Sequence, residues 1–392
     1  MKVEQSRRAL RTAFVASLWV AAVFVVCANA VGAETIEVAP LLKQIRAVGP
    51  KGEGHRDAIA AVERLSRAPA SQLPEILGGM DGAGPLATNW IRAAVDTIAQ
   101  HHLAEGGDLP ADSLESFLLD TSHAPRARRT AYELLLSVDS TARERLIPRM
   151  LDDESPELRR DAVEMALGGA KELSAKDDEV AAAAAYRKAL SAARDVDQIN
   201  LAADELEKLG QPVDLAEHFG FIVAWKLVGP FDNVDKKGFD RVYLPEERVD
   251  LNSTYEGTVG PVTWIDHTTS DRYGMVDLNK AIGKHMGAAG YAYVEFVSAE
   301  AREAELRLGC NNGNKVWLNG ELLTANHVYH TNTGIDQYVG RGMLKKGRNE
   351  ILVKVCQNEQ TEDWAQSWQF QLRVCDALGT AVLSQDRKTN SR

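Results

Sequence analysis

The sequence is poor in cysteine, which limits the cross-links and the metal sites that the chain can form. Only four cysteines occur in 392 residues, and none stands in the C-x-x-C spacing typical of metal or redox sites. Cys27 falls in an N-terminal segment that we expect to be removed, which leaves Cys310, Cys356 and Cys375. Because three cysteines cannot all pair, we expect buried free thiols, or one disulfide with one free thiol.

Positive charge is also in deficit. The chain has 45 lysines and arginines against 56 aspartates and glutamates, which gives a net charge of −11. Removal of residues 1–33 would take away four basic residues and one acidic residue and make the net charge −14. A protein this acidic repels nucleic acid and anionic lipid over the Debye length, so we predict neither as a partner.

The sequence also lacks recognisable motifs for phosphate binding and for glycoside hydrolysis. The glycine-rich stretch 78–85 follows a predicted helix and lacks the Gly-Lys-Ser/Thr ending of a phosphate-binding loop, so we interpret it as a loop between helices. Hydrolysis of a glycosidic bond needs two carboxylates at a defined separation, and no signature in the sequence identifies such a pair. We therefore predict that the protein is not an enzyme and needs no cofactor.

Long hydrophobic runs are absent except for one near the N-terminus. Residues 13–28 are almost all apolar, four basic residues precede them, and Ala28 and Ala30 provide an A-x-A-like cleavage site. This pattern predicts a signal peptide over residues 1–33 and export to the periplasm or the extracellular space. An uncleaved N-terminal anchor is the alternative, because the run approaches the ~18 residues that can span a bilayer.

Residues 40–220 have a helical composition, rich in alanine, leucine, glutamate and arginine, with proline and glycine between the helical stretches. An R-x-A-hydrophobic phrase begins at Arg56, Arg92, Arg129 and Arg160, at intervals of 36, 37 and 31 residues. Repeats of this length predict pairs of antiparallel helices stacked as an α-solenoid.

The last copy of this repeat is the clearest. In DDESPELRRDA (152–162), Ser155 is suited to cap a helix and Pro156 to occupy its first turn. The phrase resembles HEAT-type repeats, whose second helix commonly opens with a similar Asp…Pro-x-x-Arg-x-x-Ala sequence. The resemblance implies a HEAT-like helical repeat domain whose concave face contacts a protein partner.

After residue 220, β-branched and aromatic residues replace the alanines, which predicts a domain boundary at that point. Short alternating segments with turn-rich links predict an antiparallel β-sandwich of jelly-roll type over residues 221–380, followed by a disordered tail at 381–392. Ile351, Val353 and Val355 should share one face of their strand. The predicted strands are 221–231, 262–265, 291–297, 304–309, 315–318, 336–339, 351–356 and 368–375.

The stretch AELRLGCNNGNKVWLNG (304–320) predicts a β-hairpin. Ala304, Leu306 and Leu308 would face one side of the first strand, and residues 311–314 would form a turn that tolerates positive φ. This region and LKKGRNEILVKV (344–355) resemble the galactose-binding-like jelly roll that serves as the sugar-binding domain of β-galactosidase-type glycoside hydrolases. The resemblance implies glycan recognition and a structural calcium ion, although no residue identifies a calcium site.

The segment 357–367 is the first candidate for a ligand site. It combines amide and acidic side chains, including Asp363, with Trp364, and Trp368 begins the next strand. An aromatic face beside such groups is typical of sugar recognition, because a pyranose has an apolar C–H face and a rim of hydroxyls. Trp368 alternates with apolar residues on its strand, so we expect it in the core.

Asn326, His327 and His330 are further candidates. The two histidines would point to opposite faces of a strand, and no acidic third ligand is present, so we predict polar loop or sugar contacts rather than a metal site. Trp317 has two interpretations. If the residues on either side of it form the core, Trp317 is exposed and available for stacking on a sugar; otherwise it is a core residue.

These observations favour an exported, non-catalytic binding protein, with glycan recognition by the β-sandwich and protein contacts by the helical repeats. The first alternative is a structural scaffold without a small-molecule ligand. The second is a hydrolase with its site at the domain junction, which would need histidine and carboxylate side chains from both domains in one cleft.

Overall fold

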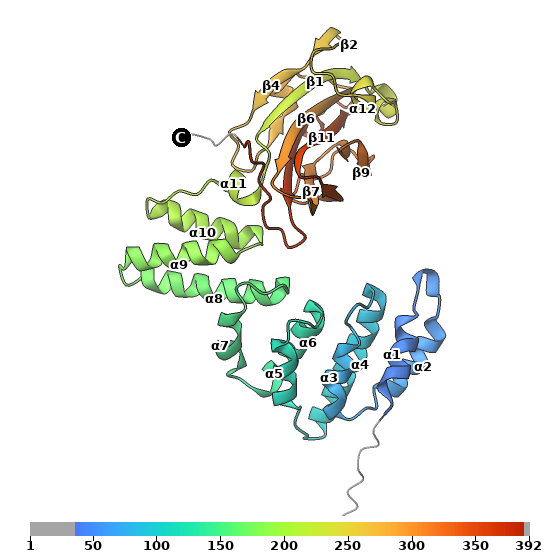
Figure 1. Cartoon of the computed structure of the whole chain (residues 1–392), viewed down its shortest axis with the longest axis vertical. Helices are drawn as coiled ribbons and strands as arrows, with labels where there is room; N and C mark the ends of the chain where they lie inside the picture. The colour runs from blue at the N-terminus through green and yellow to red at the C-terminus, as the bar shows by residue number, and fades with distance from the viewer. Residues whose placement is uncertain (1–35, 388–392) are drawn as a thin grey trace, which may run out of the picture. The chain divides into compact units, whose positions relative to one another are not determined.

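The computed structural model of the protein describes residues 36–387 (Figure 1). These residues form two compact units, one of residues 36–79 with 83–108 and the other of residues 80–82 with 109–387. The predicted signal peptide and the last five residues of the predicted tail lie outside the described residues. Within residues 36–387, no helix has both the length and the apolar character needed to span a membrane.

The first unit consists of helices that each bury one apolar face. Leu41 and Ile45 of α1 are four residues apart and both buried, and so are Ile91 and Val95 of α4. This spacing is that of an amphipathic helix. The helices of this unit are α1 (Val38–Arg46), α2 (His55–Leu65), α3 (Leu73–Gly78) and α4 (Pro85–Ala104).

The second unit begins with helices and continues with strands. Ser155 caps α8 by accepting a hydrogen bond from the Leu158 backbone N–H, and Pro156 is the first helical residue, as predicted. The helices of this part are α5 (Ala111–Leu119), α6 (Pro125–Val138), α7 (Ala142–Leu146), α8 (Pro156–Ser174), α9 (Glu179–Ala192), α10 (Val196–Lys208) and α11 (Leu215–Phe219).

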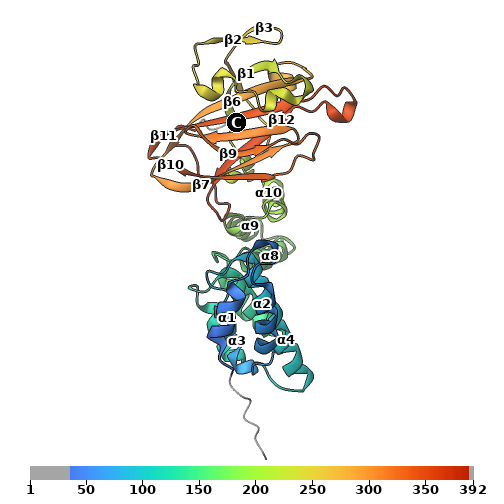
Figure 2. The ribbon, with the colours of Figure 1, turned by 90° about the vertical axis from the view of Figure 1, so that its right-hand side faces the viewer.

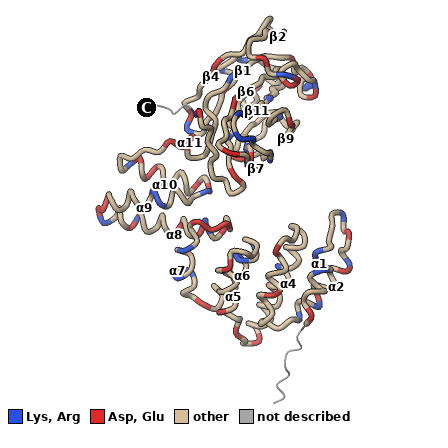
Figure 3. Tube along the Cα trace, in the orientation of Figure 1, with Lys and Arg blue, Asp and Glu red and all other residues tan. Residues whose placement is uncertain are grey.

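Ion pairs connect helices that are not consecutive in the chain. Arg129 of α6 contacts Asp161 of α8 at 2.5 Å, and Arg160 of α8 contacts Asp197 of α10 at 2.6 Å. These arginines are two of the predicted repeat positions. Basic and acidic residues are interspersed along α5–α10 (Figure 3), which suits such pairing.

The remainder of the second unit forms two antiparallel sheets and a small hairpin. The larger sheet has the strand order β4-β1-β6-β11-β8-β9, the smaller has β10-β7-β12-β5, and β2 pairs with β3 (Figures 1 and 2). The protein is therefore mixed α and β, with helices first and antiparallel sheets after them. The strands are β1 (Ala224–Asp232), β2 (Thr254–Gly257), β3 (Gly260–Thr263), β4 (Ile265–Thr268), β5 (Val276–Asp277), β6 (Ala288–Ser298), β7 (Arg302–Cys310), β8 (Gly313–Leu318), β9 (Glu321–Asn326), β10 (Tyr338–Leu344), β11 (Gly347–Gln357) and β12 (Gln369–Cys375).

The predicted hairpin over 304–320 is wrong. Its two strands, β7 and β8, belong to different sheets, and the hairpin is β8–β9, joined by Asn319 and Gly320, both with positive φ. Residues 311–314 do not have positive φ. Instead, Asn312 is fully buried and its side-chain amide donates to the Ser367 carbonyl at 2.6 Å, so the segment crosses from one sheet to the other.

One apolar core lies between the two sheets. Ala304, Leu306 and Leu308 contribute to it from the smaller sheet, and the alternating residues 351, 353 and 355 from the larger, so the predicted faces of these strands are confirmed. Trp368 is fully buried there, also as expected. The three cysteines of the described chain are free and buried, and burial raises the pKa of Cys310 to about 12.

The outer face of the larger sheet is covered by residues 233–264, which contain η4 (Val234–Phe239), α12 (Leu244–Glu247), β2 and β3. Lys354 of β11 projects into this second layer with no exposed side-chain surface. Its ammonium donates to Glu246 at 2.7 Å and to the Arg241 carbonyl at 2.8 Å. Trp317 faces the same layer and is only 9% exposed, so it is not available as a stacking platform.

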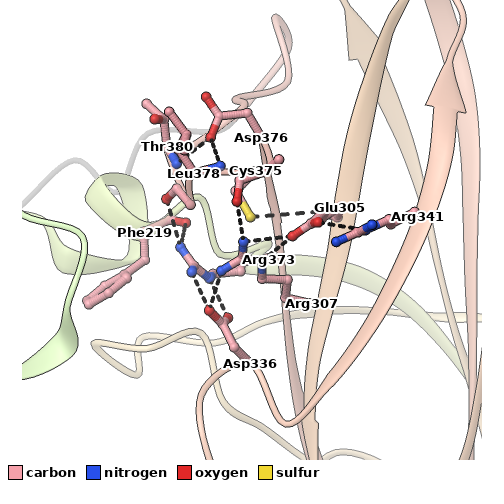
Figure 4. A network of polar contacts seen from close by, with 12 residues as sticks. Phe219, Glu305, Arg307, Asp336, Arg341, Arg373, Cys375, Asp376, Leu378 and Thr380 are labelled. Carbon is pink, nitrogen blue, oxygen red and sulfur yellow. Dashed lines mark hydrogen bonds and ion pairs between the residues drawn. The ribbon is translucent and has the colours of Figure 1, made fainter. Parts of the chain in front are cut away.

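A buried charge network joins α11 to the smaller sheet (Figure 4). Arg373 of β12 binds both oxygens of Asp336 and donates to the carbonyls of Phe219 and Gly379. Arg307 of β7 reaches the same aspartate at 2.7 Å. Burial alone would raise the pKa of Asp336, but the hydrogen bonds from the two arginines outweigh it and hold that pKa below its usual value.

Two predicted boundaries differ in the structure. Residues 381–387 are not a disordered tail, because the Val382 N–H donates to the Val374 carbonyl at 2.9 Å and Gln385 donates to Val297 at 3.0 Å. The strand predicted at 336–339 begins only at Tyr338 and extends to Leu344. In both cases, backbone hydrogen bonds to a segment distant in the sequence determine where the regular structure begins and ends.

Candidate functional site

Strand register gathers several loops at one end of the two sheets. Ala288 at the start of β6 pairs both with Asp232 at the end of β1 and with Gln357 at the end of β11. Asn326 ends β9 at the same level, and β12 begins beside the end of β7. We call this region the loop end; it comprises residues 233–237, 284–287, 327–337 and 358–368.

Trp364 stands out on this surface. It lies in the short helical turn η5 (Asp363–Ala365) and is 65% exposed. Every other phenylalanine, tyrosine and tryptophan in residues 36–387 is buried or half-buried. The other aromatic rings are buried or half-buried, whereas the indole of Trp364 is mostly exposed to solvent. It therefore has no role in the core and is available to a ligand.

His330 packs edge-on against Trp364, with ring centroids 5.2 Å apart and planes at 80°. Its Nε2 lies 2.9 Å from Oδ1 of Asn358, which is itself 3% exposed. The neighbouring Tyr329 hydroxyl accepts a hydrogen bond from the buried amide of Asn233 at 3.2 Å. Burial raises the pKa of Tyr329 to about 12 despite that hydrogen bond. The hydrogen bond to the buried Asn358 therefore holds the imidazole in place beside the indole.

Buried amides also fix the backbone that carries Trp364. The side chain of Gln357 donates to the Ala365 carbonyl at 2.8 Å, that of Asn279 to Gln366 at 2.8 Å, and that of Asn312 to Ser367 at 2.6 Å. Sequence reasoning missed these supporting residues. Their hydrogen-bond partners are backbone carbonyls of a loop distant in the sequence, and local sequence pattern does not reveal such contacts. The only indication in the sequence was the number of asparagines and glutamines.

The other predicted site residues are distributed around this end. Asp363 is exposed next to Trp364, while the His327 ring stacks on Phe239 at 4.2 Å. The amide of Asn326 donates to Asn314 at 3.0 Å. Both histidine rings contact Tyr329, but His327 stacks on Phe239 whereas His330 packs against Trp364. No group of three or more histidine, cysteine or acidic residues in the described chain is placed to hold a metal ion.

A cavity of about 520 Å³ lies at the opposite end of β1, and it is lined mainly by residues of β1, β4, β6 and the segment 382–387. Trp225, His267, Phe296 and Arg387 are among its lining residues. Burial lowers the pKa of His267. All ionisable groups that line the cavity come from residues after 220, whereas the hydrolase alternative requires groups from both parts of the chain.

No protein-family model matches the chain, and no curated protein matches it. Solved structures that are similar over part of the chain include an anti-sigma factor domain-containing protein, with 14% identity over 42% of this chain and 44% of that chain at a TM-score of 0.25. A family 35 carbohydrate-binding module from Clostridium thermocellum is 14% identical over 23% of this chain and 72% of that chain, with a TM-score of 0.17. A beta-glucuronidase from an uncultured Clostridium species is 14% identical over 39% and 28%, with a TM-score of 0.24. The chain spans less than half of the first of these, and similarity this weak assigns neither fold nor function.

Proposed function

We propose that the loop end binds a glycan and that Trp364 is the platform on which one sugar ring stacks. The observation that carries this proposal is the exposure of Trp364, unique among the aromatic rings of residues 36–387. The C–H face of a pyranose would cover the indole, and its hydroxyls would meet the polar side chains nearby. Asp363, which is exposed next to the indole, is the polar group best placed for this role, and His330 packs edge-on against the indole.

The rigidity of the loop supports a binding role. The side-chain amides of Gln357, Asn279 and Asn312 donate to the carbonyls of residues 365–367, which directly follow the indole in the chain, and hold this backbone in place. A ligand therefore does not have to order this segment when it binds, and the entropy cost of binding is lower. A surface whose only purpose was solubility would not need such support.

The wider proposal is an exported, non-catalytic protein in which the two sheets form a galactose-binding-like jelly roll. The helices would form a HEAT-like α-solenoid that contacts a protein partner. The ion pairs between Arg129 and Asp161 and between Arg160 and Asp197 support the repeat, because they join equivalent arginines to later helices. The two sheets that share one core support the sandwich.

A glycan array followed by calorimetric titration tests the site. We expect Trp364→Ala to weaken binding of the best glycan about tenfold, since a stacked aromatic contributes on the order of 1–1.5 kcal/mol. Met343→Ala is the matched control, because Met343 is 55% exposed but lies near the opposite end of the sheets. If no glycan binds the wild-type protein, the scaffold alternative is favoured. If a glycan binds but both variants bind it like the wild type, Trp364 is not the platform.

A further inference from the structure

The loop that presents Trp364 carries negative charge only. Between Gln357 and Leu372 the chain has the carboxylates Glu359, Glu362 and Asp363 and no lysine or arginine. All three carboxylates are exposed, and two of them directly precede the indole. The polar rim of the proposed sugar platform is therefore acidic rather than neutral.

Of the lysines at the loop end, Lys236 and Lys237 contact other groups, and Lys284 is exposed. The Lys236 ammonium lies 5.2 Å from the centre of the Tyr329 ring, and Lys237 contacts Asp235 at 2.7 Å. Among the described residues, Glu362 and Asp363 form no ion pair. These two carboxylates therefore lie unpaired beside Trp364, where they can attract a cationic group of a ligand.

We propose that the ligand of this site is an oligosaccharide that contains unacetylated amino sugars. This inference rests on the proposed glycan site and adds the charge of its ligand. A protonated sugar amine over an indole gains a cation–π attraction, which is stronger for tryptophan than for the other aromatic side chains. Two exposed carboxylates beside the ring add Coulombic attraction, and the same charges repel the carboxylates of uronic acids.

Calorimetric titration with three soluble tetrasaccharides tests this inference on the whole protein. The probes are a β-1,4-linked glucosamine tetramer, its fully N-acetylated form and a galacturonic acid tetramer, at a mildly acidic pH that keeps the amines protonated. We expect the glucosamine tetramer to bind about tenfold more tightly than the N-acetylated one, and the galacturonate most weakly. The preference should shrink at high ionic strength, because the carboxylates are exposed to solvent.

Charge-removing variants separate the carboxylates from the platform. The double variant Glu362→Gln/Asp363→Asn should lose the preference for the amine and bind the glucosamine and N-acetylated tetramers with equal affinity, even if the loss of Asp363 weakens both. The control Glu303→Gln/Glu321→Gln removes the same charge from exposed positions at the opposite end of the sheets and should keep the preference. All four positions are exposed, so folding is expected to survive, and the thermal midpoint of each variant verifies this.

The outcomes distinguish the two proposals. Equal binding of the amine and N-acetylated tetramers by the wild type, tighter binding of the galacturonate, or an unchanged preference in the double variant would overturn the charge inference and leave the glycan site standing. Failure of all three tetramers to bind the wild type, together with a silent glycan array, would remove the glycan site itself.

Discussion

At the scale of single residues, the protonation state of His218 depends strongly on its surroundings. It lies in α11, and burial, followed by repulsion from Arg194 and Arg373, lowers its pKa to about 4. The imidazole is therefore neutral in the folded protein over a range in which an ordinary histidine is charged. Protonation of His218 would place a third positive charge near Arg194 and Arg373, which disfavours the charged imidazole.

This shift predicts a loss of stability in mild acid. Between about pH 6.5 and pH 4 the unfolded chain binds a proton at His218 that the folded chain does not, so the free energy of unfolding falls as pH drops through this window and the loss is complete near pH 4. The loss from this group is at most about 3 kcal/mol, and less because the side chain is partly exposed. Urea unfolding at a series of pH values measures it.

His218→Gln should flatten the pH dependence in this window, while His101→Gln, on an exposed helix surface, should leave it unchanged. An identical slope for the wild type and His218→Gln would show that the histidine is not the cause.

At the scale of elements, a buried ion pair attaches α6 to the turn before α8. Arg128 makes two parallel bonds to Asp153, at 2.9 and 2.6 Å, and both side chains are less than 5% exposed. The same guanidinium donates to the Leu118 carbonyl at the end of α5. Removal of the carboxylate would leave a buried charge without its partner.

We therefore expect Asp153→Asn to lower the free energy of unfolding by about 3–5 kcal/mol, the usual cost of leaving one partner of a buried pair uncompensated. The exposed pair between Arg143 and Glu164 provides the control. Arg143→Gln should cost less than about 1 kcal/mol. Chemical denaturation followed by circular dichroism measures both. Equal costs for the two substitutions would contradict the role of burial.

Element boundaries also show where pattern reasoning succeeds. Alternation placed residues 304, 306 and 308 on a core face, because side-chain direction along a strand is local. It failed for strand pairing: Asn and Gly between β7 and β8 indicated a hairpin, but Asn312 donates to a carbonyl of a distant loop and the chain changes sheets. Turn-forming residues reveal that the chain bends but not which strand it meets next.

At the scale of the whole molecule, the compact units divide the chain near residue 108 rather than at 220. Tyr273, in the loop before β5, donates to Asn200 of α10 at 2.9 Å, and Arg272 contacts Asp204 of the same helix at 3.3 Å. Phe221 joins the apolar core of α9 and α10. The change from helix to strand at residue 220 is therefore a change of element inside one unit.

Hydrogen exchange detected by mass spectrometry can test this division. Peptides from α8–α10 should open with the same free energy as peptides from the β-strands, and independently of peptides from α1–α4, because contacts of α10 with the segment before β5 couple them. If peptides from α8–α10 instead exchange together with those of α1–α4, the boundary at 220 predicted from composition would be the correct one.

Composition and periodicity by themselves determined the order of helices and strands, the core faces of the clearest strands, the cap of α8 and the candidate status of Trp364, because each depends on neighbours within a few residues. Only the tertiary structure decided that Trp317 is covered, that residues 381–387 are ordered and that buried amides support the indole. These outcomes depend on contacts between residues far apart in the chain, such as Val382 with Val374 across the edge of a sheet and Asn312 with Ser367 below the loop. The sequence contains both members of each contact, but local pattern does not say that they meet.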